Sequence, residues 1–314
     1  MVSAGALVSV IMPVFNGEMF VASAIHSIQG QKFNDWELVI VDDCSTDRSF
    51  DICSSFSTND SRIRLFRNSE NKGLAKTMNT LISLSRGKYI AVQEQDDISV
   101  EDRLILETEI LQSQPAVGCV SGVAAWLDDH SKVFSYFSEF LNNGNQYPQN
   151  QKEMVRYLYA EQCKVVNAAC MYRRAAIRDM HGPYDADAKM SIDWQFFIHI
   201  AHKYLFFGIP KTLVKMHRGN SHQSLTKMKA LQFEEANRCI DLIYNTYKND
   251  NDSPINYWLY RKAMSTELVL EGRYYSRILG LSRLFLAILF YPVNKRAYRS
   301  IAELFLRGIR KLHI

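Results

Sequence analysis

Residues 7–14 read Leu7-Val8-Ser9-Val10-Ile11-Met12-Pro13-Val14, a nearly continuous apolar run that is rich in β-branched side chains. The run is followed by Asn16-Gly17, a dipeptide that is typical of turns. A strand with so few polar residues is typical of a parallel sheet, because such sheets are covered by helices on both faces. The start of the chain therefore predicts an α/β fold.

Helical and strand-like segments alternate after this first strand. The predicted helices cover 18–29, 47–56, 74–85 and 104–111, and the predicted strands cover 36–41, 63–66 and 89–92. Alternation of this kind predicts a mostly parallel sheet flanked by helices. In such sheets, ligands bind beyond the carboxyl ends of the strands.

The pattern changes after Gln114-Pro115. The segments 117–127 and 163–172 are strand-like, and 142–151 is polar and predicts a loop. From about Met228 the sequence becomes helical, aromatic and basic. We therefore expect a first domain over 1–225 and a helical region over 226–314.

The cysteines and the apolar segments limit the class of protein. The chain has 314 residues, and its six cysteines are far apart with no C-x-x-C pair. This spacing excludes a zinc ribbon and a dense disulfide scaffold, and it fits a reducing compartment. No Lys, Arg or long apolar stretch precedes Pro13, so a secretory signal is not expected. The longest apolar stretch, 284–291, is shorter than the ~20 residues of a bilayer crossing. A cytoplasmic protein is expected.

The positive charge lies mainly at one end of the chain. The net charge is +4, but residues 256–314 contain 11 Lys/Arg and 3 Asp/Glu among aliphatic and aromatic side chains. Such helices bind anionic membrane surfaces, and peripheral contact with the inner leaflet is one reading. The other is a helical bundle that covers the first domain or forms a homo-oligomer. No nucleic-acid recognition motif accompanies the charge, so no nucleic-acid partner is expected.

An acidic cluster, Glu94-Gln95-Asp96-Asp97, follows the predicted strand 89–92. Carboxylates with this spacing at a strand end can converge on one Mg²⁺ or Mn²⁺ ion, since both ions take oxygen ligands. A solvated acidic turn is the alternative. The position at the end of a buried strand favours the metal site.

Two further polar segments follow strands or begin helices. In Asp42-Asp43-Cys44-Ser45-Thr46-Asp47, one of the first two carboxylates could accept from a uracil N3–H, while Asp47 is expected to cap the next helix. The alternative for the doublet is a plain turn. In the segment 71–79, Gly73 permits a close turn and Lys72 or Lys76 could face a phosphate; a simple helix start explains it equally.

Asp193 and His217 are candidates for chemistry in the second half of the first domain. Asp193 precedes Trp194 and stands near two phenylalanines, and burial beside aromatic residues would raise its pKa and suit it to general-base catalysis. A helix N-cap is the alternative. His217 could bind a metal, and Lys215 or Arg218 could neutralise a diphosphate. A structural histidine is the alternative.

Taken in order, these segments resemble the family 2 glycosyltransferases over roughly residues 7–225. The resemblance is carried by Val10–Asn16, Asp42–Asp47, Asn71–Ala75, Glu94–Asp97, Asp193 and Lys215–His217. Three positions depart from the family pattern: Glu94 replaces the first aspartate of the metal motif, Ile192 replaces an acid, and Lys215 replaces an arginine. The last change makes a bidentate phosphate contact less favourable.

The resemblance implies a GT-A fold and an inverting transfer of sugar from a nucleoside diphosphate, UDP in the first instance, to a glycan hydroxyl. It implies a lipid-linked acceptor in bacterial surface polysaccharide synthesis, such as O-antigen or capsule, and Mn²⁺ or Mg²⁺ as cofactor. Asp193 is the implied catalytic base, and Asp96, Asp97, Glu94 and His217 are the implied metal site. The implied nucleotide-sugar site consists of Pro13, Val14, Phe15, Asn16, Glu18, Asp42, Asp43, Asn71, Gly73, Lys76, Gln95 and Asp96.

Three other functions fit the sequence less well than glycosyl transfer does. A nucleotidyltransferase would need a loop rich in Gly and Lys/Arg after the first strand, and Pro13–Glu18 is not such a loop. A dehydrogenase would need G-x-G-x-x-G there. A degenerate transferase that only binds nucleotide or glycan is disfavoured by the presence of Asp96, Asp97 and Asp193.

Overall fold

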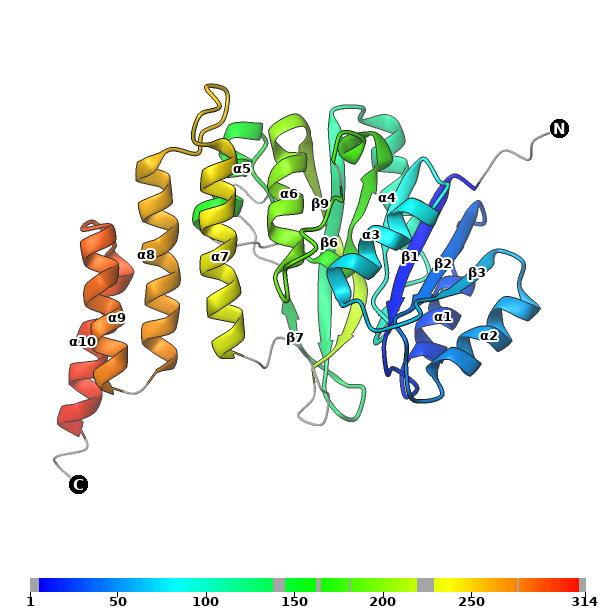
Figure 1. The fold of residues 1–314 in the computed structure, drawn as a ribbon, viewed down its shortest axis with the longest axis horizontal. Helices are drawn as coiled ribbons and strands as arrows, with labels where there is room; N and C mark the ends of the chain where they lie inside the picture. The colour runs from blue at the N-terminus through cyan, green and yellow to red at the C-terminus, as the bar shows by residue number, and fades with distance from the viewer. Residues whose placement is uncertain are drawn as a thin grey trace. The chain divides into compact units, whose positions relative to one another are not determined.

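The chain is seen here in a computed structural model that describes residues 6–137, 145–161, 165–180, 182–218, 229–275 and 277–310. Packing divides it into two compact units (Figure 1). The first comprises Met1–Met154 and Lys164–Ser224, and the second comprises Val155–Cys163 and Leu225–Ile314. The short segment 155–163 is therefore part of the second unit, although the sequence division left it in the first.

The first unit is built on one sheet, in which nine strands are described. The strands are β1 (Val8–Val14), β2 (Trp36–Asp42), β3 (Ile63–Arg67), β4 (Tyr89–Val92), β5 (Asp97–Ser99), β6 (Val117–Leu127), β7 (Val133–Phe137), β8 (Met171–Arg173) and β9 (Leu205–His217). Their order is β3-β2-β1-β4-β8-β6-β9-β5, and β7 pairs with β6. The pairs β3/β2, β2/β1, β1/β4 and β6/β9 are parallel. The predicted α/β fold with a mostly parallel sheet is confirmed.

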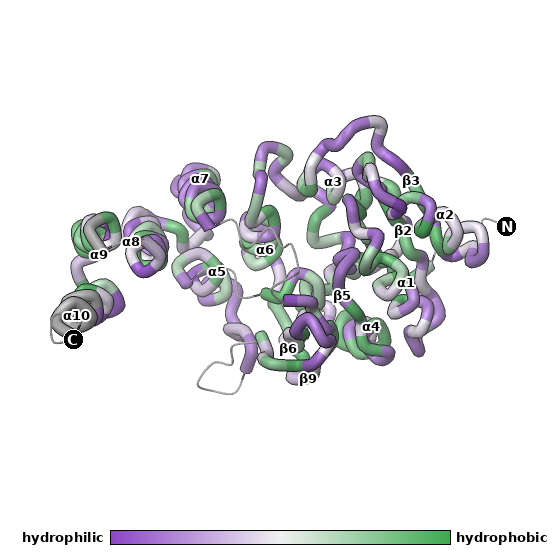
Figure 2. The backbone as a smooth tube through the Cα atoms, turned by 90° about the horizontal axis from the view of Figure 1, so that it is seen from below, coloured by the Kyte–Doolittle hydropathy of each residue, from purple (hydrophilic) through white to green (hydrophobic). Residues whose placement is uncertain are grey.

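Helices cover both faces of this sheet. They are α1 (Val21–Gln29), α2 (Ser49–Asn59), α3 (Leu74–Leu84), α4 (Arg103–Ser113) and α6 (Ile192–Lys203). Figure 2 shows α1 and α4 on one side of the strands and α3 and α6 on the other. The central strands β1, β2 and β4 are buried along nearly their whole length, and apart from Ser9, Glu37 and Asp42 their side chains are apolar, because both of their faces are covered.

Two predicted elements differ from the structure. The first helix begins at Val21 rather than at 18, because Gly17 to Phe20 form a turn in which the Phe20 N–H donates to the Gly17 carbonyl. Of the predicted strand 163–172, residues 163 and 164 lie outside the described part of the chain, and residues 165–170 form no strand. This segment contains a short 3-10 helix, η1 (Asn167–Ala169), and only Met171–Arg173 joins the sheet. A second short 3-10 helix, η2 (Arg174–Ile177), follows.

The second unit is helical. It contains α7 (Lys229–Tyr247), α8 (Tyr257–Tyr274), α9 (Arg277–Phe290) and α10 (Lys295–Arg310), and α5 (Gln151–Ala160) contributes its last residues. The helices α8 and α9 approach closely where Gly272 meets Gly280, since a Cβ on Gly280 would lie 2.6 Å from the Gly272 carbonyl oxygen. A small core of Leu268, Val269, Leu284, Ala287 and Ala297 lies between α8, α9 and α10.

Among the residues that the structure describes, no helix combines the length and the apolar character that a bilayer crossing requires.

Candidate active site

The register of the strands brings distant acidic and polar segments to one edge of the sheet. Val14 at the end of β1 pairs with Asp42 at the end of β2. At the other half of the sheet, Leu127 at the end of β6 pairs with His217 at the end of β9. The strand β5 lies beside β9, with Asp97 opposite Met216. Residues separated by more than 100 positions therefore meet at this edge.

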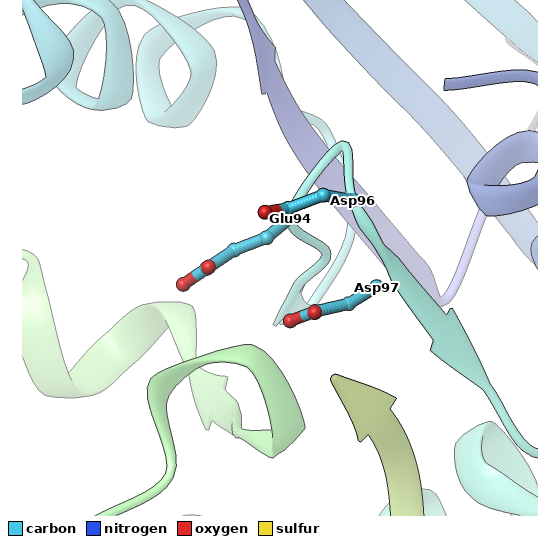
Figure 3. Close-up of side chains that lie close together, drawn as sticks. All are labelled: Glu94, Asp96 and Asp97. Atoms are coloured by element: carbon cyan, nitrogen blue, oxygen red, sulfur yellow. The ribbon is translucent and has the colours of Figure 1, made fainter. Parts of the chain in front are cut away.

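Glu94, Asp96 and Asp97 form the centre of this region. One carboxylate oxygen from each residue lies within 4.8 Å of the other two. Figure 3 shows the three side chains projecting from the same turn toward a shared space. Three oxygen donors at this spacing match the ligands that Mg²⁺ and Mn²⁺ prefer.

Asp97 is the most unusual member of the cluster. It is fully buried, and neither carboxylate oxygen has a hydrogen-bond partner among the described residues. Burial raises the pKa of Asp97 well above its usual range, and the nearby charges of Glu94 and Asp96 raise it further. A buried carboxylate without partners is costly unless a cation or a donor compensates it. The residues present therefore fit a divalent cation.

Glu94 interacts with two residues outside the acidic cluster, Asn167 and Asp193. Burial of the side chain and the charge of Asp96 raise the pKa of Glu94 to about 7, while a hydrogen bond with the side chain of Asn167 lowers it. The negative charge of Asp193 is close enough to raise this pKa as well. The charge of Asp193 therefore acts on the acidic cluster through Glu94.

His217 and Arg218 approach the cluster from the end of β9. The Nδ1 atom of His217 lies 2.7 Å from the main-chain carbonyl oxygen of Asp96. Because a carbonyl only accepts, Nδ1 carries the proton, and the lone pair of the neutral ring is on Nε2. The guanidinium of Arg218 lowers the pKa of both Glu94 and Asp97. Lys215 and Arg218 are both predicted to neutralise a diphosphate. Lys215 lies opposite Ile98 in the sheet and is exposed, whereas the charge of Arg218 affects the pKa values of Glu94 and Asp97.

Asp193 lies in the first turn of α6 and is partly buried. Burial raises the pKa of Asp193 to about 6, and a main-chain hydrogen bond partly offsets this effect. The N-cap position is occupied by Ser191, so Asp193 does not serve as the N-cap. A carboxylate with this pKa is ionised at neutral pH and is basic enough to accept a proton from a hydroxyl group.

A buried polar network behind the acidic cluster was not found from the sequence. The Gln93 side-chain amide donates to the carbonyl oxygens of Glu94 (2.9 Å) and Asp97 (2.8 Å). Arg103, which is fully buried, donates to Ser99 Oγ and to the carbonyls of Val92 and Cys170. It also forms an ion pair with Glu107. This network fixes both ends of the turn that carries the acids.

Gln93→Met is expected to weaken binding of a divalent cation about tenfold while the chain stays folded. Methionine has nearly the same volume, but it leaves the Glu94 and Asp97 carbonyls without their donor, at a cost of roughly 1–3 kcal/mol. Thermal stabilisation of the protein during a Mn²⁺ titration measures the effect. Gln29→Met, which removes only a hydrogen bond to Asp60, is the control. Equal Mn²⁺ midpoints in the Gln93 variant and the wild type would contradict a role in shaping the turn.

Gln95 holds the loop after β1 instead of projecting into the site. Its Oε1 accepts from the Phe15 N–H (2.9 Å), and its Nε2 donates to the Phe15 carbonyl (3.0 Å). A Cβ at Gly17 would lie 2.4 Å from Gln95 Oε1, so a side chain at this position would displace the Gln95 amide. The Phe15 ring remains 44% exposed at the end of β1. Pro13 is partly buried, and Val14 is buried in the core.

The loops after β1 and β2 are joined by reciprocal hydrogen bonds. The Asn16 side chain accepts from the Thr46 N–H (2.9 Å), and the Asn16 N–H donates to Ser45 Oγ (3.0 Å). The Glu18 N–H donates to Asp47 Oδ2 (3.0 Å), and Glu18 Oε2 accepts from the Arg48 N–H (3.1 Å). Asp47 also accepts from the Ser49 N–H at the first residue of α2. The N-cap position of α2 is occupied by Arg48, so the prediction that Asp47 is the cap residue is wrong by one position, although Asp47 binds the first N–H of the helix.

Both carboxylates of the Asp42-Asp43 pair have partners in the structure, although Asp42 Oδ1 has none among the described residues. Asp42 is buried and forms an ion pair with Arg67 (3.1 Å). Asp43 accepts from the side chain of Asn68 and from the N–H groups of Lys72 and Gly73. Asp43 thus positions the loop before α3.

That loop contains the remaining predicted residues. Asn71 accepts from the Gly73 N–H (3.1 Å) and is exposed. Gly73 has φ +82°, a conformation that favours glycine, and precedes the first residue of α3. Lys76 is exposed on the first turns of α3.

Two curated glycosyltransferases are similar to part of this chain. A teichuronic acid biosynthesis glycosyltransferase of Bacillus subtilis, TuaG, is 32% identical over 123 residues, which are 39% of this chain and 49% of the relative. The Escherichia coli enzyme WfgD, named UDP-Glc:alpha-D-GlcNAc-diphosphoundecaprenol beta-1,3-glucosyltransferase, is 36% identical over 105 residues, 33% of this chain and 41% of the relative. The matched part is thus about half or less of the length of these relatives.

The structure of TarS residues 1–349 from S. aureus, in complex with UDP-GlcNAc, superposes with a TM-score of 0.66 at 14% identity. The match covers 96% of this chain and 92% of TarS 1–349. This likeness concerns the fold alone and confirms the expected GT-A fold. The sequence also matches the glycosyl transferase family 2 model over residues 9–181, more than half of its length. The chain belongs to glycosyl transferase family 2.

Proposed function

We propose that the protein is an inverting glycosyltransferase that moves a hexosyl or N-acetylhexosaminyl group from a UDP-sugar to a hydroxyl of a lipid-linked glycan. The proposal is supported by the convergence of the Glu94, Asp96 and Asp97 carboxylates and by the charge of Asp193, which raises the pKa of Glu94. A divalent ion, Mn²⁺ or Mg²⁺, would be held by Asp96 and Asp97, and Glu94 and His217 are the further proposed ligands. When bound, such an ion neutralises charge on the donor diphosphate.

The reaction requires one displacement at the anomeric carbon. The acceptor oxygen forms a bond to this carbon as its proton passes to the carboxylate of Asp193. The bond from the anomeric carbon to the β-phosphate oxygen breaks, and the nucleoside diphosphate leaves with the electron pair. One base is sufficient for a single displacement, which inverts the configuration. A positioned base of this kind contributes about 10²–10⁴-fold to the rate.

The donor and the acceptor are inferred from chemistry and from the relatives. WfgD carries a UDP-sugar donor and a diphosphoundecaprenol acceptor in its name, and TarS 1–349 was solved with UDP-GlcNAc. In this chain the exposed Phe15 ring at the end of β1 offers a surface for the uracil base. The name of TuaG supports synthesis of a bacterial surface polysaccharide. Such an acceptor would place the enzyme at the inner face of the cytoplasmic membrane.

The donor is identified by thermal stabilisation. UDP-glucose, UDP-galactose and their N-acetyl forms are tested with Mn²⁺, with Mg²⁺ and with EDTA. A donor at 100 times its Kd is expected to stabilise the fold by about 2.7 kcal/mol. The same mixtures are assayed for slow release of UDP, which a protein that only binds nucleotide would not produce. If no nucleotide sugar raises the melting temperature with either ion, the proposal is wrong.

A further inference from the structure

Helix α9 has an apolar face that no described residue covers. Leu279, Phe285, Leu286 and Leu289 are between 38% and 68% exposed. At 100° per residue these positions fall on one continuous side of the helix. The opposite side is also apolar, since Leu284 and Ala287 are buried in the small core with α8 and α10. Apart from Ser282 and Arg283, the central part of α9 is apolar on both sides, and a helix of this kind is typically buried, so the exposed side of α9 calls for a cover.

The surroundings of this face are basic. Residues 277–310 contain seven Lys/Arg and one acid, Glu303. Lys295 and Arg299 are exposed on α10 and form no ion pair with any residue that the structure describes. Arg283 borders the apolar face and is paired with Glu271 (2.9 Å). The cover of α9 must therefore combine an apolar surface with negative charge.

Two aromatic residues of α8 lie near the C-terminal end of α9, to which Arg261 connects them. The guanidinium of Arg261 donates to the carbonyl oxygens of Leu289 and Phe290. It also lies 5.7 Å from the ring of Tyr257 and 5.6 Å from that of Trp258. Both rings are more than half exposed. Exposed Trp and Tyr beside arginine are typical of side chains at the boundary between lipid and water.

We propose that the exposed face of α9, together with Lys295, Arg299 and Trp258, lies on the surface of an anionic phospholipid bilayer. The apolar side chains enter the boundary of the acyl chains, and the cations contact phosphate headgroups. This membrane contact rests on the proposed function in one respect: its role would be to keep the enzyme beside a lipid-linked acceptor. It deepens that proposal by naming the surface, and it requires no particular donor or reaction.

The test is co-sedimentation of the full chain with vesicles of phosphatidylcholine, with and without phosphatidylglycerol. The wild type is expected to sediment with the anionic vesicles and to be released at high salt, because the attraction between exposed charges is screened. Phe285→Ser with Leu289→Ser is expected to lower the bound fraction at least about tenfold. Lys295→Glu with Arg299→Glu is expected to remove the preference for phosphatidylglycerol.

Phe134→Ser with Tyr136→Ser is the matched control, because these residues are similarly exposed but lie on β7 of the first unit. This variant is expected to bind vesicles as the wild type does. Circular dichroism and melting temperature verify that all variants fold. UDP-sugar binding in solution is measured in parallel, so a failure of membrane contact is distinguished from a failure of the proposed function.

Three results would overturn the proposal. The wild type could stay in solution with anionic vesicles, or the α9 variant could sediment as the wild type does. Light scattering without lipid could also show a dimer that the α9 substitutions convert to a monomer. In the last case, the face is covered by a second copy of the chain.

Discussion

Asp97→Ala is expected to lower the kcat/KM of glycosyl transfer that depends on a divalent ion at least about 10³-fold. Asp97 supplies the carboxylate whose oxygens have no partner among the described residues, so its loss removes the donor that most needs a cation. Release of UDP is measured across a Mn²⁺ titration. An unchanged titration curve in the variant would exclude Asp97 as a ligand.

Asp97→Asn tests whether the buried charge of this carboxylate destabilises the metal-free protein, apart from its proposed role as a metal ligand. Burial keeps the pKa of Asp97 raised in the folded protein, so the folded state binds a proton more tightly than the unfolded state does. Stability of the metal-free protein is therefore lost as pH rises from the ordinary Asp range through the raised pKa. The amide has no charge to desolvate. In EDTA at pH 8 the inactive variant is expected to have a free energy of unfolding roughly 1–3 kcal/mol higher than the wild type, and therefore a higher melting temperature. The difference in melting temperature between the two proteins should become smaller toward pH 4. Identical melting curves across this range would contradict the uncompensated charge.

Asp193→Asn is expected to reduce kcat at least about 10²-fold and to leave donor binding nearly unchanged. The amide keeps the shape of the side chain but cannot take the proton of the acceptor hydroxyl. Turnover is measured at saturating donor, and donor affinity is measured separately by thermal stabilisation. Asp187→Asn, at an exposed position just before α6, is the control. Near-normal turnover in the Asp193 variant would remove this residue from the role of base.

The pH dependence of turnover gives a second test of Asp193 as the catalytic base. Its pKa is raised to about 6 by burial, and the base must be ionised to act. In the wild type kcat is therefore expected to fall as pH decreases through about 6, since the carboxylate becomes protonated. The residual activity of Asp193→Asn should lack this decline. The same acidic limb in both proteins would assign it to another group.

The sequence predicted the central strands well because their pattern depends only on burial. The predicted strands 36–41 and 89–92 agree with β2 and β4 within one residue. The segment 163–172 was predicted wrongly for a related reason. It is apolar because it is buried, but the turn at Asn167 places that side chain against Glu94, and hydrophobicity alone does not distinguish a buried strand from a buried turn.

The candidate site was predicted in part, and what was missed depends on contacts between distant segments. The acidic doublet after β2 stays a predicted ligand site, but the sequence did not indicate that Asp43 also accepts from Asn68 and from the Gly73 N–H. Gln95 belongs to the acidic motif, but it binds the main chain of Phe15, 80 positions earlier. Arg103 looks like an ordinary surface residue of a helix and is fully buried. No local pattern indicates such pairings, since each is fixed only when the strands have taken their register.

The mutual bonding of Asn16 and Glu18 with Ser45 to Arg48 has a consequence for engineering. A chimera that receives only one of these two loops from a homologue would lose both halves of the exchange, since each half is completed by the other segment. Grafts intended to alter donor choice should therefore carry the two loops as a pair, and a single graft should perform worse than the double one.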